Sequence, residues 1–148
     1  MSIANLKIEL KVLRPEIMNQ WPSRGIPSYG TPLSAGTDLY AALSEAVTIA
    51  ADATVFVPSG LAIHIREAGW AGVVMSRSGL GTKQGLVVKQ GVGLIDADYQ
   101  GEIMVAIHNI SSESRTIAPG DRIAQLVLMP VARAEWQEVT AFSEDTVR

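Results

Sequence analysis

Cysteine is absent from this sequence, and histidine occurs only twice, at His64 and His108. The chain therefore forms no disulfide and no thiolate metal site, and it has too few histidines for a histidine-rich metal cluster. No apolar run approaches the 18 residues of a membrane span, and the N-terminus lacks the unbroken apolar run of a signal peptide. These absences predict a soluble, cytoplasmic protein without a membrane partner.

A surplus of positive charge is also lacking, because the formal net charge is −3. Broad nucleic-acid surfaces are normally basic, so we expect no nucleic-acid partner. The net charge does not exclude a small anionic ligand, since a few local donors can hold one. The 148 residues, 47% of them hydrophobic, are enough for one core, and we expect a single domain over residues 1–148.

Period-two alternation of apolar residues is the main structural signal, and it occurs at 8–12, 61–65 and 103–107. A nearly continuous apolar run follows at 123–129, as in a strand covered on both faces. Frequent Gly and Pro turns separate these runs, which predicts an all-β sandwich or barrel. We expect at most one short helix, near Ser78 and capped by that serine, and a long surface loop over 14–32.

The stretch GLIDADYQGEI, residues 93–103, places two acids and a tyrosine between apolar runs. A calcium loop is excluded because its twelfth position, a glutamate in such loops, is Ile107 here. One interpretation is a hairpin turn with the aspartates at its tip. The other is that Asp96, entering directly after apolar residues, is desolvated enough to act as a base.

Three further stretches carry polar residues in unusual settings. Residues 76–81, SRSGLG, could be an ordinary loop or an anion nest, and they match neither a Walker loop nor a nucleophile elbow. Asp38 lies in the small, apolar stretch 35–39 and could be a buried acid tied to backbone amides. In 120–125, GDRIAQ, a turn Asp121 could pair with Arg122, whereas Gln125 is a polar residue in a buried strand and needs partners.

Taken in order, AGTDL (35–39), RSGL (77–80), GLIDADYQG (93–101) and GDRIAQ (120–125) resemble the first four motifs of the trimeric dUTPases. The resemblance covers nearly the whole chain. It implies a distorted β-barrel, jelly-roll-like subunit and a homotrimer with active sites between subunits. It also implies Mg²⁺-dependent hydrolysis of dUTP to dUMP and pyrophosphate, which limits uracil in DNA and supplies dUMP for dTMP synthesis.

The resemblance also assigns roles to individual residues. Asp96 is expected to position and deprotonate the water that attacks the α-phosphorus in line, while Asp98 fixes the turn that aims Tyr99. Asp38 is expected to hold Mg²⁺ only through water, with no direct protein ligand, because the phosphates carry the ion. The phosphates are expected to be held by Arg77, Ser78, Gly79 and Gln125.

Substrate selection is assigned to the third motif, expected to form a hairpin. Tyr99 would pack flat on deoxyribose, where a ribose 2′-OH collides with it. The backbone of Gly93, Leu94 and Ile95, with Met104 across the hairpin, would read uracil and leave no room for the thymine methyl group. Gln90 is a candidate uracil contact where many bacterial relatives have Asn.

A fifth motif of the family, an arginine followed by a glycine-rich tail, would begin where the sequence stops at Arg148. We therefore expect a shortened or processed form that trimerises and binds dUTP but turns over slowly. The residues do not exclude two other functions. One is a dCTP deaminase-type enzyme of the same fold, and the other is a nucleotide-binding module without catalysis.

Overall fold

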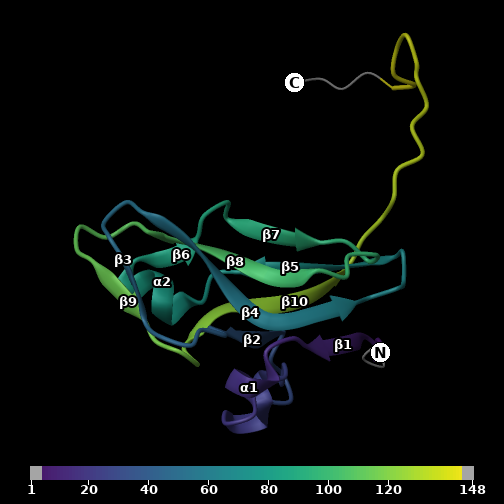
Figure 1. Cartoon of the computed structure of the whole chain (residues 1–148). Helices are drawn as coiled ribbons and strands as arrows, with labels where there is room; N and C mark the ends of the chain where they lie inside the picture. Colours follow the sequence, from purple (N-terminus) through teal and green to yellow (C-terminus); the bar gives the residue numbers. More distant parts are fainter. Residues whose placement is uncertain (1–4, 145–148) are drawn as a thin grey trace.

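The computed structural model describes residues 5–144, so Arg148 and the expected start of the fifth motif lie outside the described residues. The described chain folds into two four-stranded antiparallel sheets that face each other, with a two-stranded sheet at one end (Figure 1). This architecture confirms the all-β prediction. Within residues 5–144, no helix is long and apolar enough to cross a membrane.

The strand order in each sheet fixes which sequence segments become neighbours. The first sheet contains β1 (Glu9–Val12), β4 (Thr54–His64), β8 (Glu102–Asn109) and β6 (Leu86–Val88), in that order. The second contains β2 (Gly36–Tyr40), β10 (Arg122–Pro130), β5 (Trp70–Met75) and β7 (Val92–Ile95). The small sheet pairs β3 (Val47–Ile49) with β9 (Arg115–Ile117).

The inner faces of the two large sheets form one hydrophobic core. Ile103, Val105 and Ile107 of β8 are at most 3% exposed, as their alternation predicts. They share a single cluster with Leu39 of β2 and Leu126 of β10 from the opposite sheet. The core therefore explains why apolar residues recur at every second position. The chain after β10 leaves the two sheets as an extended segment (Figure 1).

The helical content differs from the sequence prediction. Two short α-helices are present in the described chain, α1 (Pro15–Met18) and α2 (Ser78–Gln84), together with a 3₁₀ turn η1 (Pro22–Gly25). The surface loop predicted over 14–32 is therefore wrong, because α1 buries Met18 completely. Proline is compatible with this helix because it occupies the first turn, where its missing N–H costs nothing.

A bulge in β4 anchors α1 to the first sheet. The pairing of β4 with β8 shifts register between Pro58 and Ala62, and Gly60 inside the shift has φ +72°. A Cβ at Gly60 would overlap the Met18 sulfur, so only glycine fits under α1. The N–H of Leu13, just before α1, donates to the Gly60 carbonyl at 2.8 Å. The N-terminal segment is thus tied directly to the bulge of β4.

The expected hairpin around 93–103 is wrong in its pairing. Strand β7 pairs with β5 in one sheet, whereas β8 pairs with β4 and β6 in the other. The linker between them, 96–101, therefore crosses from one sheet to the other. Alternation identifies a strand and its buried face, but it does not identify the strand beside it.

Candidate active site

A cluster of charged side chains joins β2, β10 and the start of α2. The Arg77 Nε donates to Asp38 Oδ1 at 2.7 Å, and Arg122 Nη1 lies 3.4 Å from Asp38 Oδ2. Asp38 is thus held by two arginines, not by backbone amides, and Arg122 pairs with Asp38 and not with Asp121. Two guanidinium groups against one carboxylate leave a net positive charge, which suits an anionic ligand.

Strand register brings Gln125 into the same cluster. Gln125 of β10 lies directly opposite Asp38 of β2 on one side and Met75 of β5 on the other. Its Nε2 donates to the Ser76 carbonyl at 3.0 Å, and the Ser76 hydroxyl accepts the Val88 N–H at 2.8 Å. The amide predicted to need partners therefore has one, and that partner, Ser76, directly precedes Arg77 along the chain.

The predicted phosphate-binding run starts the helix α2. Arg77 is the N-cap residue with extended backbone, and Ser78 is the first helical residue, so the serine does not cap the helix as predicted. Ser78 and Gly79 are exposed, and a Cβ placed on Gly79 would meet nothing within 4 Å. An anion can therefore approach these backbone groups closely.

A narrow slot opens between β7 and β8, where the two strands belong to different sheets. Its volume is about 180 Å³, smaller than the roughly 300 Å³ at which sites for drug-sized ligands begin. A slot of this size suits one ring system of a larger ligand. All six residues predicted to read the base and sugar line it: Gln90, Gly93, Leu94, Ile95, Tyr99 and Met104.

The walls of this slot are strand edges with available backbone groups. Strand β6 pairs with β8 only at Ile107–Asn109, and β7 pairs with β5 on its other side. Within the described residues, no strand pairs with the slot-facing edges at 92–95 and 102–105. Backbone N–H and C=O groups there can form the hydrogen bonds that a paired strand would otherwise take.

The Tyr99 ring is fixed over Gly101. A Cβ built on Gly101 would lie 2.5 Å from the Tyr99 hydroxyl oxygen and 2.8 Å from Cζ, so the ring occupies the space of a side chain. The Tyr99 hydroxyl donates to the Glu102 carbonyl at 3.0 Å, and its N–H donates to the Asp96 carbonyl at 3.1 Å. Backbone groups therefore close this turn, in place of the Asp98 carboxylate that was predicted to fix it.

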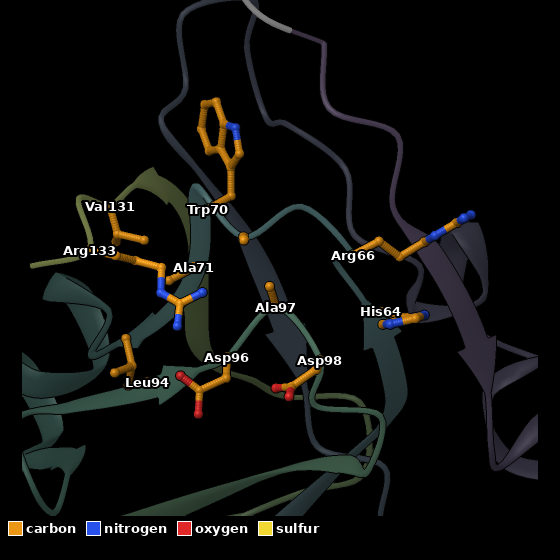
Figure 2. A pocket seen from close by; sticks show the side chains of 11 residues that line it. His64, Arg66, Trp70, Ala71, Leu94, Asp96, Ala97, Asp98, Val131 and Arg133 are labelled. Carbon is orange, nitrogen blue, oxygen red and sulfur yellow. The ribbon is translucent and has the colours of Figure 1, made fainter. Parts of the chain in front are cut away.

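A larger cavity of about 540 Å³ lies beside the slot and contains Asp96. Figure 2 shows the carboxylates of Asp96 and Asp98 on one wall, with the Arg133 guanidinium reaching toward Asp96 from the segment after β10. Asp96 is exposed in the single chain, although Ile95 before it is 6% exposed. The predicted desolvation of Asp96 is therefore wrong for one chain alone.

Asp96 and the arginine cluster lie at opposite ends of β5. Ile95 pairs with Gly72 and Val92 with Met75, so Asp96 is level with the start of β5 and Arg77 follows its end. Six residues of extended chain separate these levels, or about 20 Å at ~3.3 Å per residue. One chain therefore does not bring Asp96 and Arg77 to the same phosphorus atom.

A metal ion has few protein ligands available in this region. The described residues contain no group of three or more His, Cys, Asp or Glu side chains that could hold an ion. Asp38 is the one carboxylate in the cluster, and both its oxygens face arginines. A hard ion that arrives on phosphates and keeps its waters fits this donor set, with Asp38 accepting a hydrogen bond from bound water.

Several residues of the site were missed by sequence reasoning. Arg122 was interpreted as the partner of the turn residue Asp121, Ser76 as part of a loop or an anion nest, and Arg133 was not considered. Arg133 had one available signal, a basic residue directly after the last strand. Arg122 and Ser76 had none, since their partners are 84 and 49 residues away along the chain.

Comparison with known proteins gives a consistent result. The dUTPase family model matches residues 23–148. A deoxyuridine 5'-triphosphate nucleotidohydrolase of Salmonella paratyphi A is 52% identical over 136 residues, which are 92% of this chain and 88% of the relative. The Salmonella typhi protein of the same name has the same identity and coverage.

Solved structures show the same fold. The Staphylococcus bacteriophage 80alpha dUTPase superposes with a TM-score of 0.80 at 25% identity, covering 93% of this chain and 99% of the phage chain. A dUTPase from phage phi11 of S. aureus, described with a structural Mg(II) ion, gives a TM-score of 0.79 at 22% identity, covering 93% and 99%.

Proposed function

The chain belongs to the dUTPase family, and we propose on that premise that it hydrolyses dUTP to dUMP and pyrophosphate. One observation supports this proposal most strongly. The six residues expected to read base and sugar come from three separate segments, 90–95, 99 and 104, and all of them line one slot. In the cell, the reaction would limit uracil in DNA and supply dUMP for dTMP synthesis, and we place it in the cytoplasm.

Uracil is proposed to enter the slot edge-on. The backbone groups of Gly93, Leu94 and Ile95 on one wall and Met104 on the other would pair with its donor and acceptor atoms, and Gln90 adds a side-chain amide. A cytosine would present the wrong pattern and leave buried groups unpaired, which is costly. A slot this narrow also disfavours the thymine methyl group, and Tyr99 would close the sugar side against a 2′-OH.

The reaction proposed is in-line attack of water on the α-phosphorus, with pyrophosphate leaving. Asp96 would accept the proton of the water and hold its oxygen in line. Arg77, the Ser78 hydroxyl, the Gly79 N–H and Gln125 would bind the phosphate oxygens. Phosphoryl transfer depends mainly on placement and charge compensation, so several fixed donors matter more than one strong base.

Mg²⁺ is proposed as the cofactor. When bound it would neutralise charge on the triphosphate and favour departure of pyrophosphate. The protein would hold it indirectly, with Asp38 oriented by its two arginines and accepting from a metal-bound water. That orientation leaves Asp38 unable to turn toward an ion directly without breaking both pairs.

The complete active site is proposed to lie between copies of the chain in a homotrimer. Asp96 and the slot would come from one copy, and Asp38, Arg77 and Gln125 from its neighbour. Support comes from the strand register, which places Asp96 and Arg77 of one chain about 20 Å apart, at the two ends of β5. A triphosphate held by both residues of the same chain would have to span that distance. The exposure of Asp96 is consistent with this arrangement, because a neighbouring copy would cover it.

Pyrophosphate release from dUTP, dTTP, UTP and dCTP tests the proposal. With Mg²⁺ present, kcat/KM for dUTP should exceed that for each competitor by about a hundredfold or more, the range that unpaired polar groups and steric clashes supply. Chelating the ion should lower the dUTP rate. Equal rates for all four nucleotides would contradict the proposal, and ammonia release from dCTP would instead indicate the deaminase of the same fold.

A further inference from the structure

An ion pair joins the N-terminal segment to the start of β8, outside the predicted motifs. Arg14 Nε donates to Glu102 Oε1 at 2.9 Å, and Arg14 Nη2 donates to Oε2 at 3.2 Å. This two-pronged geometry fixes the carboxylate in a plane as well as in position. The hydrogen bond to Glu102 raises the pKa of Arg14, so the guanidinium stays charged throughout the pH range of an assay.

The same carboxylate also holds the β4 bulge. The Gly60 N–H donates to Glu102 Oε1 at 3.0 Å, at the point where the register of β4 against β8 shifts. Gly60 is in turn fixed under Met18 of α1 and bonded to Leu13. Glu102 therefore connects a rigid anchor in the N-terminal segment to the first residue of β8.

The backbone of Glu102 faces the substrate slot. Its carbonyl accepts the Tyr99 hydroxyl at 3.0 Å, and the residue lines the slot together with Tyr99. The ring of Tyr99 also packs closely on Gly101, and the Tyr99 N–H donates to the Asp96 carbonyl, but the bond to the Glu102 carbonyl is the one that fixes the hydroxyl end of the ring. A displacement of Glu102 would therefore move a group that holds the tyrosine ring.

We propose that the Arg14–Glu102 pair is a positioning device that sets the sugar selectivity of the site by holding Tyr99 rigid through the Glu102 carbonyl. This inference rests on the proposed function, in which Tyr99 rejects a 2′-OH. A steric wall excludes an added oxygen only if the wall does not yield. The pair is only partly buried, with side-chain exposures of 37% and 20%, so we expect its removal to leave the chain folded.

The test is the substrate selectivity of Arg14→Met, which keeps the aliphatic stem and removes the guanidinium. The ratio of kcat/KM for dUTP to that for UTP should fall about tenfold, with the loss for dUTP mainly in KM, because a looser ring binds the sugar less well. The ratio for dUTP to dTTP should stay unchanged, since the base slot rejects the methyl group. Glu102→Gln keeps an acceptor for the Gly60 N–H. Its ratio of kcat/KM for dUTP to that for UTP should therefore lie between the ratios of Arg14→Met and the unsubstituted chain.

Matched controls separate positioning from general loosening. Glu113→Gln removes the acid of a surface ion pair with Arg115, and Arg24→Met removes an arginine bonded to Asn19 in the same N-terminal region. Neither substitution should alter either ratio. Arg14→Met combined with Glu102→Gln should cost less selectivity than the sum of the two, because the two residues act through one contact.

Two results would overturn the inference. If both ratios fell together in Arg14→Met, the pair would be merely structural, and if neither fell, Tyr99 would be held without it. The proposed function is tested in the same series by the unsubstituted chain. Failure of that chain to prefer dUTP would overturn both proposals, whereas a selective unsubstituted chain with an unchanged Arg14→Met would overturn this one alone.

Discussion

Asp96→Asn is expected to lower pyrophosphate release from dUTP by about a thousandfold, within the range typical of a lost general base. The amide has the shape of the carboxylate but does not accept the proton of the attacking water. Asp96 is exposed in the single chain and makes no ion pair within the described residues, so the substitution should not affect folding. Single-turnover rates at saturating dUTP and Mg²⁺ measure the effect.

Binding separates chemistry from structure in this variant. The Kd for dUTP, measured by calorimetry, should stay within about threefold, because the slot and the arginine cluster are unchanged. Asp98→Asn is the matched control, since Asp98 lines the same cavity two residues away. It should retain the rate within about tenfold. Loss of dUTP binding in Asp96→Asn would show that Asp96 is structural, and equal losses in both variants would remove the distinction between the two acids.

Two inactive variants are expected to restore each other when mixed. Asp96→Asn lacks the base but keeps the arginine cluster, and Arg77→Gln lacks the cluster's central arginine but keeps the base. If each site takes Asp96 from one copy and Arg77 from the next, random mixing leaves about one quarter of the sites intact. Co-expressed chains with different tags, purified as mixed assemblies, should therefore regain about a third of the unsubstituted activity, because purification removes the pure trimers and every mixed trimer has one intact site of three.

The complementation experiment discriminates sharply between shared and separate sites. Each variant alone should stay near background, so the recovered rate is measured against almost none. If Asp96 and Arg77 served the same site within one chain, no mixed assembly would contain an intact site. Absence of recovery in verified mixed assemblies would therefore contradict the shared site.

The strands of the core could be predicted from sequence because burial on one face imposes alternation. Ile103, Val105 and Ile107 illustrate this directly. The pairing of β7 with β5, and not with β8, could not be predicted, since alternation specifies a face and leaves the neighbour open. Helix α1 was missed because Pro15 was interpreted as a loop residue, although proline is favoured in a first turn.

The site itself was predictable only through its motifs. The residues alone did not decide whether Asp96 is a turn residue or a general base. The resemblance to a family favoured the general base. The partners of Asp38 come from residues 39 and 84 positions later, which no local pattern shows. The pair of Arg14 and Glu102, 88 positions apart, likewise has no sequence signal, because its meaning depends on the fold that brings the two together.

The most direct test of the central claim is the fate of oxygen from labelled water. With dUTP and Mg²⁺ in ¹⁸O-water, a single turnover should place the label in the phosphate of dUMP and leave pyrophosphate unlabelled, as attack at the α-phosphorus requires. Mass spectrometry of both products reads the outcome. Label in pyrophosphate would place the attack at the β-phosphorus and contradict the roles assigned to Asp96 and the arginine cluster.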